Sequence, residues 1–410
     1  MKTSIKILSI NSGSSSLKFK LYEMPSEKVI VSGLADRIGD EKNGIFYIKN
    51  GYTGEKRDIN VKIKNHTTAV KTLLNALIDF KIIKDFNDID AVGHRVVQGG
   101  NFFSHGVIAD EYVEKKIEDL IQLAPLHNKA NLIGIKAFKK IIPNALSVTC
   151  FDTAFHQTMS AEDYLFPIPY EYYEKYNIRR YGAHGISHNF LAQKAKKYLK
   201  NIKNPKIISC HLGNGGSITA IKNFKCIATS MGLTPLGGIM MGTRCGDIDP
   251  SVFYFLMKCT NNNGQDIYEI LNKKSGFLGV SGISNDSRDI IIADQKGISQ
   301  AQLSNALFVR RVADYIGQYF VRLGGCDLII FSGGIGENSS FIRERICAAI
   351  KESLGISIDK KRNDFLKKGE EKVISNDDSK IKIVVIPTDE ELMIAKETYN
   401  ILKNKNKIEK

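Results

Sequence analysis

The sequence predicts an α/β protein built from two copies of one unit, and three observations support that prediction. Short apolar runs that end at polar, glycine-containing or acidic loops alternate with amphipathic helical segments along the chain. A strand, turn and strand pattern near the N-terminus recurs 200 residues later. The chain of 410 residues is long enough for about two to four domains of ordinary size.

Two hairpins are the first predicted elements of the two copies. One has strands at 5–10 and 17–22 around the turn 11–16, and the other has strands at 207–210 and 218–221 around the turn 211–217. Both turns are rich in glycine, serine and asparagine, as a pair of facing phosphate-binding loops would require. Three positions are identical at an offset of 200: Ile7, Ser9 and Gly13 match Ile207, Ser209 and Gly213.

The remaining elements alternate in the same way. Further strands are predicted at 89–92, 145–150, 328–331 and 383–386. Helices are predicted at 67–80, 187–199, 302–323, 341–354 and 390–402. Ligands of open α/β sheets bind beyond the carboxyl ends of the strands, so we expect the loops there to form one site or two facing sites. The repeat places the boundary between the two copies near residue 150.

The composition excludes several classes of protein. With 43% hydrophobic and 25% charged residues the chain is neither disordered nor collagen-like. It has no run of about 18 apolar residues, and its N-terminus becomes polar too early for a signal peptide, so we expect a soluble, cytoplasmic protein without a membrane partner. Seven cysteines without a C-x-x-C pair predict neither a disulfide framework nor a zinc site.

The net charge of +14 does not by itself identify a partner. Only 13 of the 58 basic residues are arginines, and the lysines are scattered along amphipathic segments. No aromatic-interleaved basic patch or recognition motif is present, so we do not expect a nucleic-acid partner.

Three loops could hold phosphate. Neither the G-x-x-x-x-G-K-[ST] loop nor the G-x-G-x-x-G turn occurs, so a bound nucleotide would need another cradle. The small-residue loops at 11–16, 211–217 and 333–338 are the candidates, and the last leads into a predicted helix whose N-terminal N–H groups favour anions. Each alone could be an ordinary tight turn, whereas three at strand ends favour phosphate binding.

A small set of charged and acid/base residues stands near glycines. Arg95 and Arg244 are flanked by glycine-rich sequence, where a guanidinium can reach a ligand that the backbone approaches closely. His127, Asp152 and His184 complete a predicted anion-binding and acid/base set. The acidic cluster 389–391 follows a strand and could hold Mg²⁺ together with substrate phosphate, or could simply stabilise the N-terminus of the last helix.

These residues together resemble the acetate kinase family. The resemblance rests on motifs that cover nearly the whole chain in order, at 11–18, 93–97, 124–128, 151–156, 181–185, 211–215, 241–247 and 387–391. It implies two duplicated actin-like (ribonuclease H-like) domains with a nucleotide cleft between them. The implied domains are 1–150 plus 386–410, in which a C-terminal helix returns to the first domain, and 151–385.

The resemblance also implies the reaction and its residues. The family transfers the γ-phosphoryl group of ATP to acetate directly and in line, reversibly giving acetyl phosphate and ADP, which serves acetyl-CoA biosynthesis. It implies a homodimer that uses ATP/ADP as substrate with Mg²⁺, which Mn²⁺ can replace. The implied catalytic residues are Asp152, His184 and Arg244, and the metal ligands are Asn11 and Glu390. The implied substrate-binding residues are Arg95, Val97, Leu126, His127, Ala183 and Pro235. The implied nucleotide-binding residues are Ser14, Ser16, Lys18, His211, Leu212, Gly213, Asn214, Gly215, Asp286, Ser287, Arg288, Gly334, Ile335, Gly336, Glu337 and Asn338.

Asp152 is not needed as a base for this reaction. A carboxylic acid with a pKa of about 4 to 5 is already ionised at neutral pH. We therefore expect Asp152 to orient an arginine or the water shell of the metal.

Departures from the family pattern leave alternatives open. Ala183 stands where the family usually has phenylalanine, which would open the acyl pocket and favours a propionate or butyrate kinase as the alternative. Gln98 replaces a common histidine, and Asp389 replaces a common asparagine, adding a carboxylate that could tighten Mg²⁺ binding. A non-catalytic actin-like ATP switch is a further alternative, but it would have no use for Arg95, His184 and Arg244.

Overall fold

Two β-sheets organise the chain, one in each of two units. The computed structural model describes all residues except 1–3, 41–43, 60, 126 and 409–410. Contacts divide the chain into unit 1, which is Met1–Gln157 with Asp389–Lys410, and unit 2, which is Thr158–Thr388. These divisions lie close to the boundaries at 150 and 386 that the resemblance implied.

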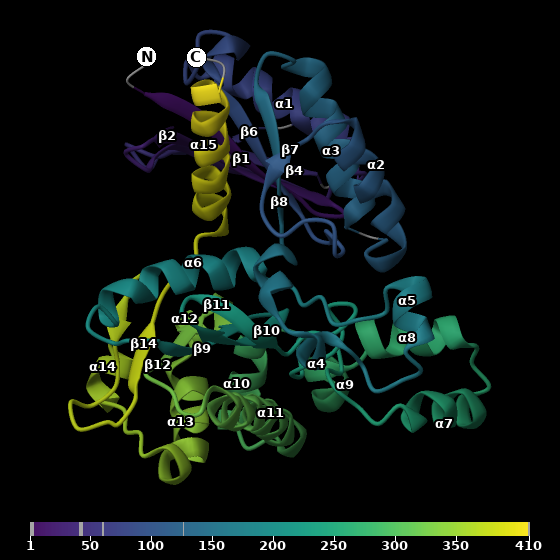
Figure 1. Cartoon of the computed structure of the whole chain (residues 1–410), viewed down its shortest axis with the longest axis vertical. Helices are drawn as coiled ribbons and strands as arrows, with labels where there is room; N and C mark the ends of the chain where they lie inside the picture. Colours follow the sequence, from purple (N-terminus) through teal and green to yellow (C-terminus); the bar gives the residue numbers. More distant parts are fainter. Residues whose placement is uncertain (1–3, 41–43, 60, 126, 409–410) are drawn as a thin grey trace. The chain divides into compact units, whose positions relative to one another are not determined.

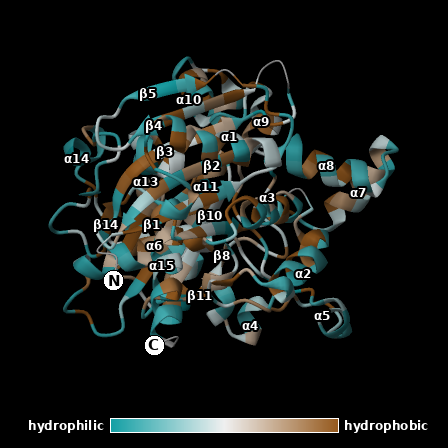
Figure 2. Ribbon diagram, turned by 90° about the horizontal axis from the view of Figure 1, so that it is seen from above, coloured by the Kyte–Doolittle hydropathy of each residue, from teal (hydrophilic) through white to brown (hydrophobic). Residues whose placement is uncertain are grey.

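Unit 1 contains an eight-stranded mixed sheet in the order β5-β4-β3-β2-β1-β6-β8-β7. The central strands β1, β6 and β8 are parallel, and the others run antiparallel to their neighbours. The edge strand β5 has exposed charged residues, and Figure 2 colours it hydrophilic. The strands are β1 (Ile5–Ser12), β2 (Ser16–Met24), β3 (Lys28–Asp36), β4 (Ile45–Asn50), β5 (Lys56–Ile59), β6 (Ala91–Val96), β7 (Val107–Ile108) and β8 (Leu146–Phe151).

Unit 2 contains a six-stranded mixed sheet in the order β11-β10-β9-β12-β14-β13. Here β9, β12 and β14 are the parallel strands, and the other pairs are antiparallel. The strands are β9 (Lys206–Leu212), β10 (Gly216–Lys222), β11 (Lys225–Thr229), β12 (Leu328–Ser332), β13 (Lys372–Val373) and β14 (Lys382–Val385).

The two sheets share one topology. The run β3-β2-β1-β6-β8-β7 in unit 1 has the same order and the same pair directions as β11-β10-β9-β12-β14-β13 in unit 2. The third strand of each run, β1 or β9, contains two of the three repeated positions, Ile7 and Ser9 or Ile207 and Ser209, and the third, Gly13 or Gly213, directly follows it. The structure therefore confirms the α/β class and shows the duplication that the offset of 200 residues predicted.

Helices cover both faces of each sheet (Figure 1). In unit 1, α15 (Glu390–Ile408) packs on one face, and α1 (His66–Asp79) and α3 (Asn128–Ile141) pack on the other, next to α2 (Glu111–Asp119). Single-turn 3₁₀ segments lie at Phe86–Asp88, Leu120–Leu123 and Ala154–Thr158. The alternation of β1 explains this arrangement, because Leu8 and Ile10 join the core beneath α1 and α3 while Ile7 packs with Ala395 of α15.

Unit 2 is layered in the same way. The long helix α11 (Ser299–Leu323) contacts β9 and β10 and packs against α13 (Ser340–Leu354), while α6 (Gly185–Ala195) contacts β9. In the first hairpin of this unit, Cys210, Leu212 and Ile218 enter the same hydrophobic core as α11. The other helical segments are α4 (Ala161–Tyr164), α5 (Glu171–Tyr176), 3₁₀ Lys196–Tyr198, α7 (Ser251–Thr260), α8 (Gly264–Lys273), α9 (Gly276–Ser281), α10 (Ser287–Gln295), α12 (Gly333–Asn338) and α14 (Lys360–Asp364).

One predicted loop is a helix. The segment 333–338 forms the six-residue helix α12 rather than an open turn. Gly333 has φ +75°, and a Cβ at that residue would lie 2.7 Å from the carbonyl oxygen of Leu212, so only glycine lets the chain turn from β12 into this helix. None of the helices in the described part of the chain has the length and apolar character needed to cross a membrane.

Candidate active site

In unit 1 the parallel strands bring three of the predicted site residues together. Asn11, Arg95 and Asp152 lie at the carboxyl ends of β1, β6 and β8, which are neighbours in the sheet. The Arg95 guanidinium donates to Asp152 through Nε (3.2 Å) and Nη2 (2.5 Å), and Nη1 donates to the Asn11 side-chain oxygen at 3.1 Å. Glu390, the first residue of α15, has a carboxylate oxygen 3.8 Å from Arg95 Nε.

The charges in this cluster are strongly coupled. Burial raises the pKa of Glu390 to about 7; Arg95 opposes that shift, and the carboxylates of Asp152 and Glu391 add to it. Burial alone would lower the pKa of Arg95, but the carboxylates of Asp152 and Glu390 raise it above its ordinary value. The environment of Glu390 is therefore one in which a further positive charge would be stabilised.

A second set of charges surrounds the start of α15. Lys18 Nζ lies 2.6 Å from a carboxylate oxygen of Glu391, and Lys20 Nζ lies 2.8 Å from Asp389 Oδ1. Asp389 also accepts from the Tyr22 hydroxyl at 3.1 Å and from the backbone N–H of Leu392 at 3.0 Å. The additional carboxylate at Asp389 is thus engaged with the N-terminus of α15 and with Lys20, and its expected effect on Mg²⁺ binding stays a prediction.

The expected acyl-binding residues of unit 1 lie near the same sheet. Val97 follows β6 and is buried, and its backbone N–H donates to the side chain of Asn131. His127 is half-buried at the N-terminus of α3. Leu126 lies outside the described residues. Gln98 is buried, and its side-chain oxygen accepts from Gly100 N–H, so this departure from the family pattern has a structural use.

In unit 2, His184 and Arg244 point to a common place. His184 has a left-handed backbone, with φ 58° and ψ 22°, directly before α6. A Cβ placed on Gly215 would lie 3.5 Å from His184 Nε2 and 3.5 Å from Arg244 Nη1. The imidazole and the guanidinium therefore both approach the side of Gly215 where a side chain would stand.

The Arg244 guanidinium is held by neutral groups. No carboxylate in the described part of the chain forms an ion pair with it, and its side chain donates instead to the Pro235 carbonyl oxygen at 3.1 Å and to Met241 Sδ at 3.7 Å. Burial lowers the pKa of Arg244 from its ordinary value. A largely buried guanidinium held by neutral groups is suited to an anionic ligand.

Ala183 is buried among methionines. It forms a small apolar cluster with Met231 and Met241, and all three are at most 3% exposed. The space that a phenylalanine ring would occupy is therefore bordered by these flexible side chains. Pro235 is half-buried, and its carbonyl oxygen accepts the hydrogen bond from Arg244.

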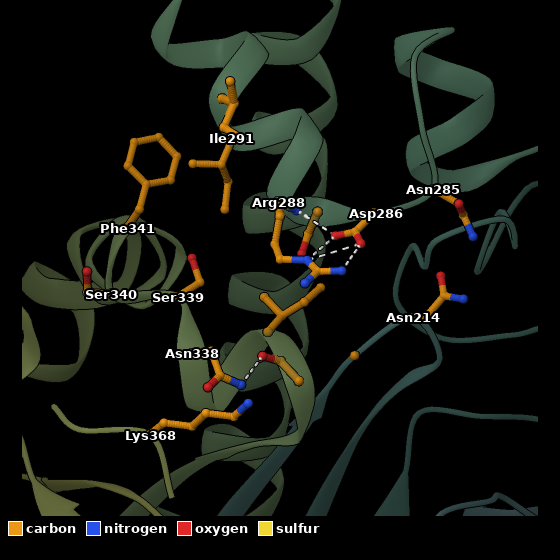
Figure 3. Close-up of a pocket in the computed structure, with 15 residues that line it drawn as sticks. Asn214, Asn285, Asp286, Arg288, Ile291, Asn338, Ser339, Ser340, Phe341 and Lys368 are labelled. Atoms are coloured by element: carbon orange, nitrogen blue, oxygen red, sulfur yellow. Dashed lines mark hydrogen bonds and ion pairs between the residues drawn. The ribbon is translucent and has the colours of Figure 1, made fainter. Parts of the chain in front are cut away.

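A cavity of about 760 Å³ lies beside the second hairpin of the repeat, within unit 2 (Figure 3). Arg288 and Asp286 form an ion pair within it, with Arg288 Nη2 2.5 Å from Asp286 Oδ2, and Phe341 and Ile291 add apolar surface. Hydrogen bonds from the Arg288 side chain lower the pKa of Asp286 to about 2. The volume suits a nucleotide-sized ligand.

Half of the predicted nucleotide-binding residues line this cavity, and the others do not. Those that line it are Gly213, Asn214, Asp286, Ser287, Arg288, Gly334, Ile335 and Asn338. Ser14 and Ser16 lie at the turn between β1 and β2, and Lys18 lies in β2, so all three belong to unit 1. His211, Leu212, Gly215, Gly336 and Glu337 lie nearby in sequence without lining the cavity.

Glu337 has a structural use. Its carboxylate accepts from the backbone N–H groups of Gly333 at 2.9 Å and Thr388 at 3.1 Å. These bonds join α12 to the end of the last strand of the sheet. The contact of Glu337 with a nucleotide stays a prediction.

The sequence analysis did not predict several residues of the site. The cavity is also lined by Asn285, Ile291, Ile292, Ser339, Ser340, Phe341 and Lys368. Near His184, the buried residues His188, Ser209 and Ser217 form hydrogen bonds with one another. The spacing of His184 and His188, four residues apart at the start of a helix, was a sequence signal for the second histidine. Among the described residues no group of three or more His, Cys, Asp and Glu side chains is arranged to hold a metal.

The chain is similar to known proteins over nearly its whole length. Residues 6–396 match the model of the acetokinase family. The chain is 49% identical over 399 residues to "Acetate kinase" of Bacillus subtilis, covering 97% of this chain and 100% of that protein. Among solved structures, Porphyromonas gingivalis acetate kinase has a TM-score of 0.91 at 43% identity, covering 97% of this chain and 100% of that one. A propionate kinase from Francisella tularensis has a TM-score of 0.90 at 40% identity with the same coverage.

Proposed function

The chain belongs to the acetokinase family, and we propose that the residues described above carry out a direct, in-line and reversible transfer of the ATP γ-phosphoryl group to acetate. The enzyme is a phosphotransferase with a carboxyl group as acceptor, and ATP and ADP are its nucleotide substrates. The observation that carries the proposed site is that Arg244 and His184 both approach Gly215, on the loop whose Gly213 and Asn214 line the cavity.

Transition-state stabilisation falls to His184 and Arg244. The transferring phosphoryl group spreads negative charge over its equatorial oxygens, and acetate brings a second negative charge toward it. A preorganised guanidinium and an imidazole N–H stabilise that charge without having to reorient during the reaction. The absence of an acidic partner for Arg244 among the described residues supports this role, because its charge is not neutralised before the substrates bind.

Arg95 is proposed to bind the acetate carboxylate, and Asp152 to orient Arg95. Because acetate is already ionised at neutral pH, no base has to remove a proton from it. The two hydrogen bonds from Arg95 to Asp152 support the orienting role, since they fix the plane of the guanidinium. Val97, His127, Ala183 and Pro235 are proposed to line the acyl site, together with Leu126.

The nucleotide is proposed to occupy the cavity in unit 2. Its phosphates would approach the backbone of Gly213 and Gly334, where the absence of a side chain permits close contact. The base and sugar would lie toward Ile291, Phe341 and the Asp286–Arg288 pair. The remaining predicted contacts, including Lys18 and the serines of the first turn, stay proposals for the bound state.

Mg²⁺ is proposed to bind at Asn11 and Glu390. The raised pKa of Glu390 supports this site, because burial and neighbouring carboxylates leave it short of positive charge. Mg²⁺ generally takes one or two carboxylates, with water and substrate phosphate as its other ligands. When bound, the ion would neutralise charge on the phosphates, and Mn²⁺ would be expected to replace it.

We further propose that the enzyme acts as a homodimer of actin-like units in the cytoplasm. Exposed apolar side chains on α7 support an interface with a second copy, since Tyr254 is 57% and Phe255 62% exposed. The shared strand order of the two sheets supports the actin-like duplication.

The stereochemistry at phosphorus tests the direct transfer. A γ-phosphoryl group made chiral with oxygen isotopes should reach acetate with inverted configuration, because a single in-line displacement inverts the centre. Retention would mean two successive displacements and an intermediate on the protein, contrary to the proposal. An ATP switch would make no acetyl phosphate and would hydrolyse ATP at the same rate with and without acetate.

A further inference from the structure

A chain of hydrogen bonds links His184 to the interior of unit 2. His184 Nδ1 lies 2.9 Å from Ser217 Oγ, and the same Oγ lies 2.8 Å from His188 Nε2. His188 Nδ1 in turn lies 2.9 Å from Ser209 Oγ. His188, Ser209 and Ser217 are fully buried, so bulk water does not compete for these bonds.

Helix and strand periodicity build this chain. His184 is the N-cap residue of α6, and His188, in the first turn of that helix, donates its backbone N–H to the His184 carbonyl oxygen at 2.9 Å. In the hairpin of β9 and β10, Ser209 pairs with Thr219 and His211 pairs with Ser217. Because side chains alternate along a strand, these polar groups share one face of the sheet, while Cys210, Leu212 and Ile218 fill the core on the other.

The single proton of Ser217 limits the arrangements that are possible. Its hydroxyl can donate to at most one of the two imidazoles, and an imidazole to which it does not donate must itself donate to the hydroxyl oxygen. In the first arrangement, His188 Nε2–H donates to Ser217, Ser217 donates to His184 Nδ1, and a neutral His184 carries its proton on Nε2. In the second, His184 carries a proton on Nδ1 and donates it to Ser217, whether the Ser217 hydroxyl donates to His188 Nε2 or accepts from it as well.

The surroundings of His184 favour a neutral ring. Arg244 Nη1 and His184 Nε2 face the same point at Gly215, so a second positive charge there would be repelled. The His184 ring is also stacked on His211, with centroids 4.3 Å apart and planes 26° apart. A neutral His184 in the second arrangement would present a lone pair, rather than a proton, to the negative phosphoryl group.

We infer that His188, acting through Ser217, holds the proton of His184 on Nε2, so that the Nε2–H group can donate a hydrogen bond to the transferring phosphoryl group. This inference rests on the proposed function for the direction of the hydrogen bonds. It makes His188, Ser217 and Ser209 positioning residues, because none of them has to touch a substrate. Ser209 completes the chain by donating to His188 Nδ1, which fixes the tautomer of His188 in turn.

Nitrogen NMR of the ¹⁵N-histidine-labelled enzyme tests the inference directly. The chemical shifts of the ring nitrogens distinguish a protonated from an unprotonated nitrogen, and the His184 signals are assigned by their loss in His184→Gln. We expect His184 to carry its proton on Nε2 in the wild-type enzyme, and to lose this single tautomer in Ser217→Ala. In that variant kcat should fall about 10- to 100-fold, while the KM values for ATP and acetate stay unchanged.

A conservative variant separates positioning from packing. His188→Gln retains one N–H donor and one carbonyl acceptor, so it should restore most of the activity and the tautomer, whereas His188→Phe should not. Ser304→Ala is the matched control, because Ser304 is another fully buried serine of unit 2, and its hydroxyl has no hydrogen-bond partner in the described structure. It should change neither kcat nor the His184 signals.

Two results would overturn the inference. One is a wild-type His184 with its proton on Nδ1, and the other is a folded Ser217→Ala enzyme with wild-type kcat. The NMR measurement needs no turnover, so the tautomer can be read even if acetate were not phosphorylated. Failure of the inference is therefore distinguishable from failure of the proposed function.

Discussion

Arg244 is the side chain whose charge matters most at the scale of single residues. Its guanidinium is largely buried and donates only to a carbonyl oxygen and a thioether among the described residues, so its charge remains available for an anion. A group of this kind contributes chiefly where negative charge develops during phosphoryl transfer. It should therefore affect turnover more than binding.

Arg244→Ala should lower kcat by about 10³-fold or more and leave the affinity for ADP nearly unchanged. Steady-state kinetics and calorimetric titration with ADP measure the two effects. Arg244→Lys should recover part of the loss, because it keeps the charge without the planar fork. Arg310→Ala is the control, since Arg310 is exposed on α11. Wild-type turnover in Arg244→Ala would contradict the assignment.

Acyl selectivity is a second property set by individual residues. Ala183 suggested from the sequence that the pocket is enlarged, but its buried neighbours Met231 and Met241 border that space. We expect acetate to be preferred for this reason. Met231→Ala should raise the ratio of propionate to acetate turnover about 10-fold, because one methylene in a pocket is worth about 1–3 kcal/mol of discrimination.

The matched control for this variant is Met240→Ala. Met240 is also buried, but it belongs to the main core cluster of unit 2 and not to the group around Ala183. It should lower the melting temperature without altering the ratio of the two acids. An unchanged ratio in Met231→Ala would show that this cluster does not border the acyl site.

At the scale of elements, the loop that carries Arg244 is held in place by its own backbone. Asp247 N–H donates to the Gly238 carbonyl oxygen at 2.8 Å, and Gly238 N–H donates to Asp247 Oδ1 at 2.7 Å. The Asp247 carboxylate also accepts from the Tyr315 hydroxyl of α11. The loop is thus fastened to the long helix of the core, which keeps Arg244 in one orientation.

Gly246→Ala tests whether this loop must keep its shape. Gly246 has φ +74°, and a Cβ there would lie 2.5 Å from the Gly238 carbonyl oxygen, so the loop would have to move. We expect a large loss of kcat together with a loss of about 1–3 kcal/mol in the free energy of unfolding. Gly297→Ala is the control, because it has φ +81° but no atom within 4 Å of the added Cβ. Gly297→Ala should show a smaller loss of stability and a normal kcat. An equal loss of kcat in the two variants would show that the close approach of the added Cβ to Gly238 is not the cause.

Much of the element pattern could be predicted from sequence periodicity. The helix expected at 302–323 is α11 at Ser299–Leu323, and the strand expected at 5–10 is β1 at Ile5–Ser12. The helix over 333–338 could not be predicted, since its glycines read as a turn and its formation depends on the close approach of Gly333 to Leu212. Local propensity carries no information about such a contact.

Some residues of the candidate site could be predicted from the sequence and others could not. Arg95 and Asp152 could be predicted because they follow apolar strands that end at one edge of a sheet. Lys368 could not, because it reaches the cavity from an irregular segment distant in sequence from the other lining residues. The hydrogen-bonded partners of His184 come from three elements, so only the i, i+4 histidine gave a signal in the sequence.

At the scale of the whole molecule, the proposed homodimer has a testable surface. Phe255 on α7 is 62% exposed, next to exposed Tyr254 and Val252. Phe255→Glu should convert dimers to monomers in light scattering, because a charge buried in an interface without a partner is costly. Val321→Glu is the control, since Val321 is 78% exposed on α11, and it should leave the mass unchanged. An unaltered dimer in Phe255→Glu would place the interface elsewhere.

The duplicated topology gives both units the same arrangement of parallel strands, and the proposed function assigns part of the chemistry to each. Unit 1 holds the Arg95–Asp152 pair, and unit 2 holds His184, Arg244 and the nucleotide-sized cavity. In the proposed function the first set binds the carboxylate, and the second binds the nucleotide and the transferring phosphoryl group.

The most direct measurement is the initial rate with ATP and Mg²⁺ for acetate, propionate and butyrate, with the acyl phosphate trapped by hydroxylamine. We expect hydroxamate to form fastest from acetate, more slowly from propionate and slowest from butyrate, because Met231 and Met241 border the space beside Ala183. Hydroxamate formed mainly from propionate or butyrate would contradict the assignment of acetate as the acceptor. No hydroxamate from any of the three acids would contradict phosphoryl transfer to a carboxylate altogether.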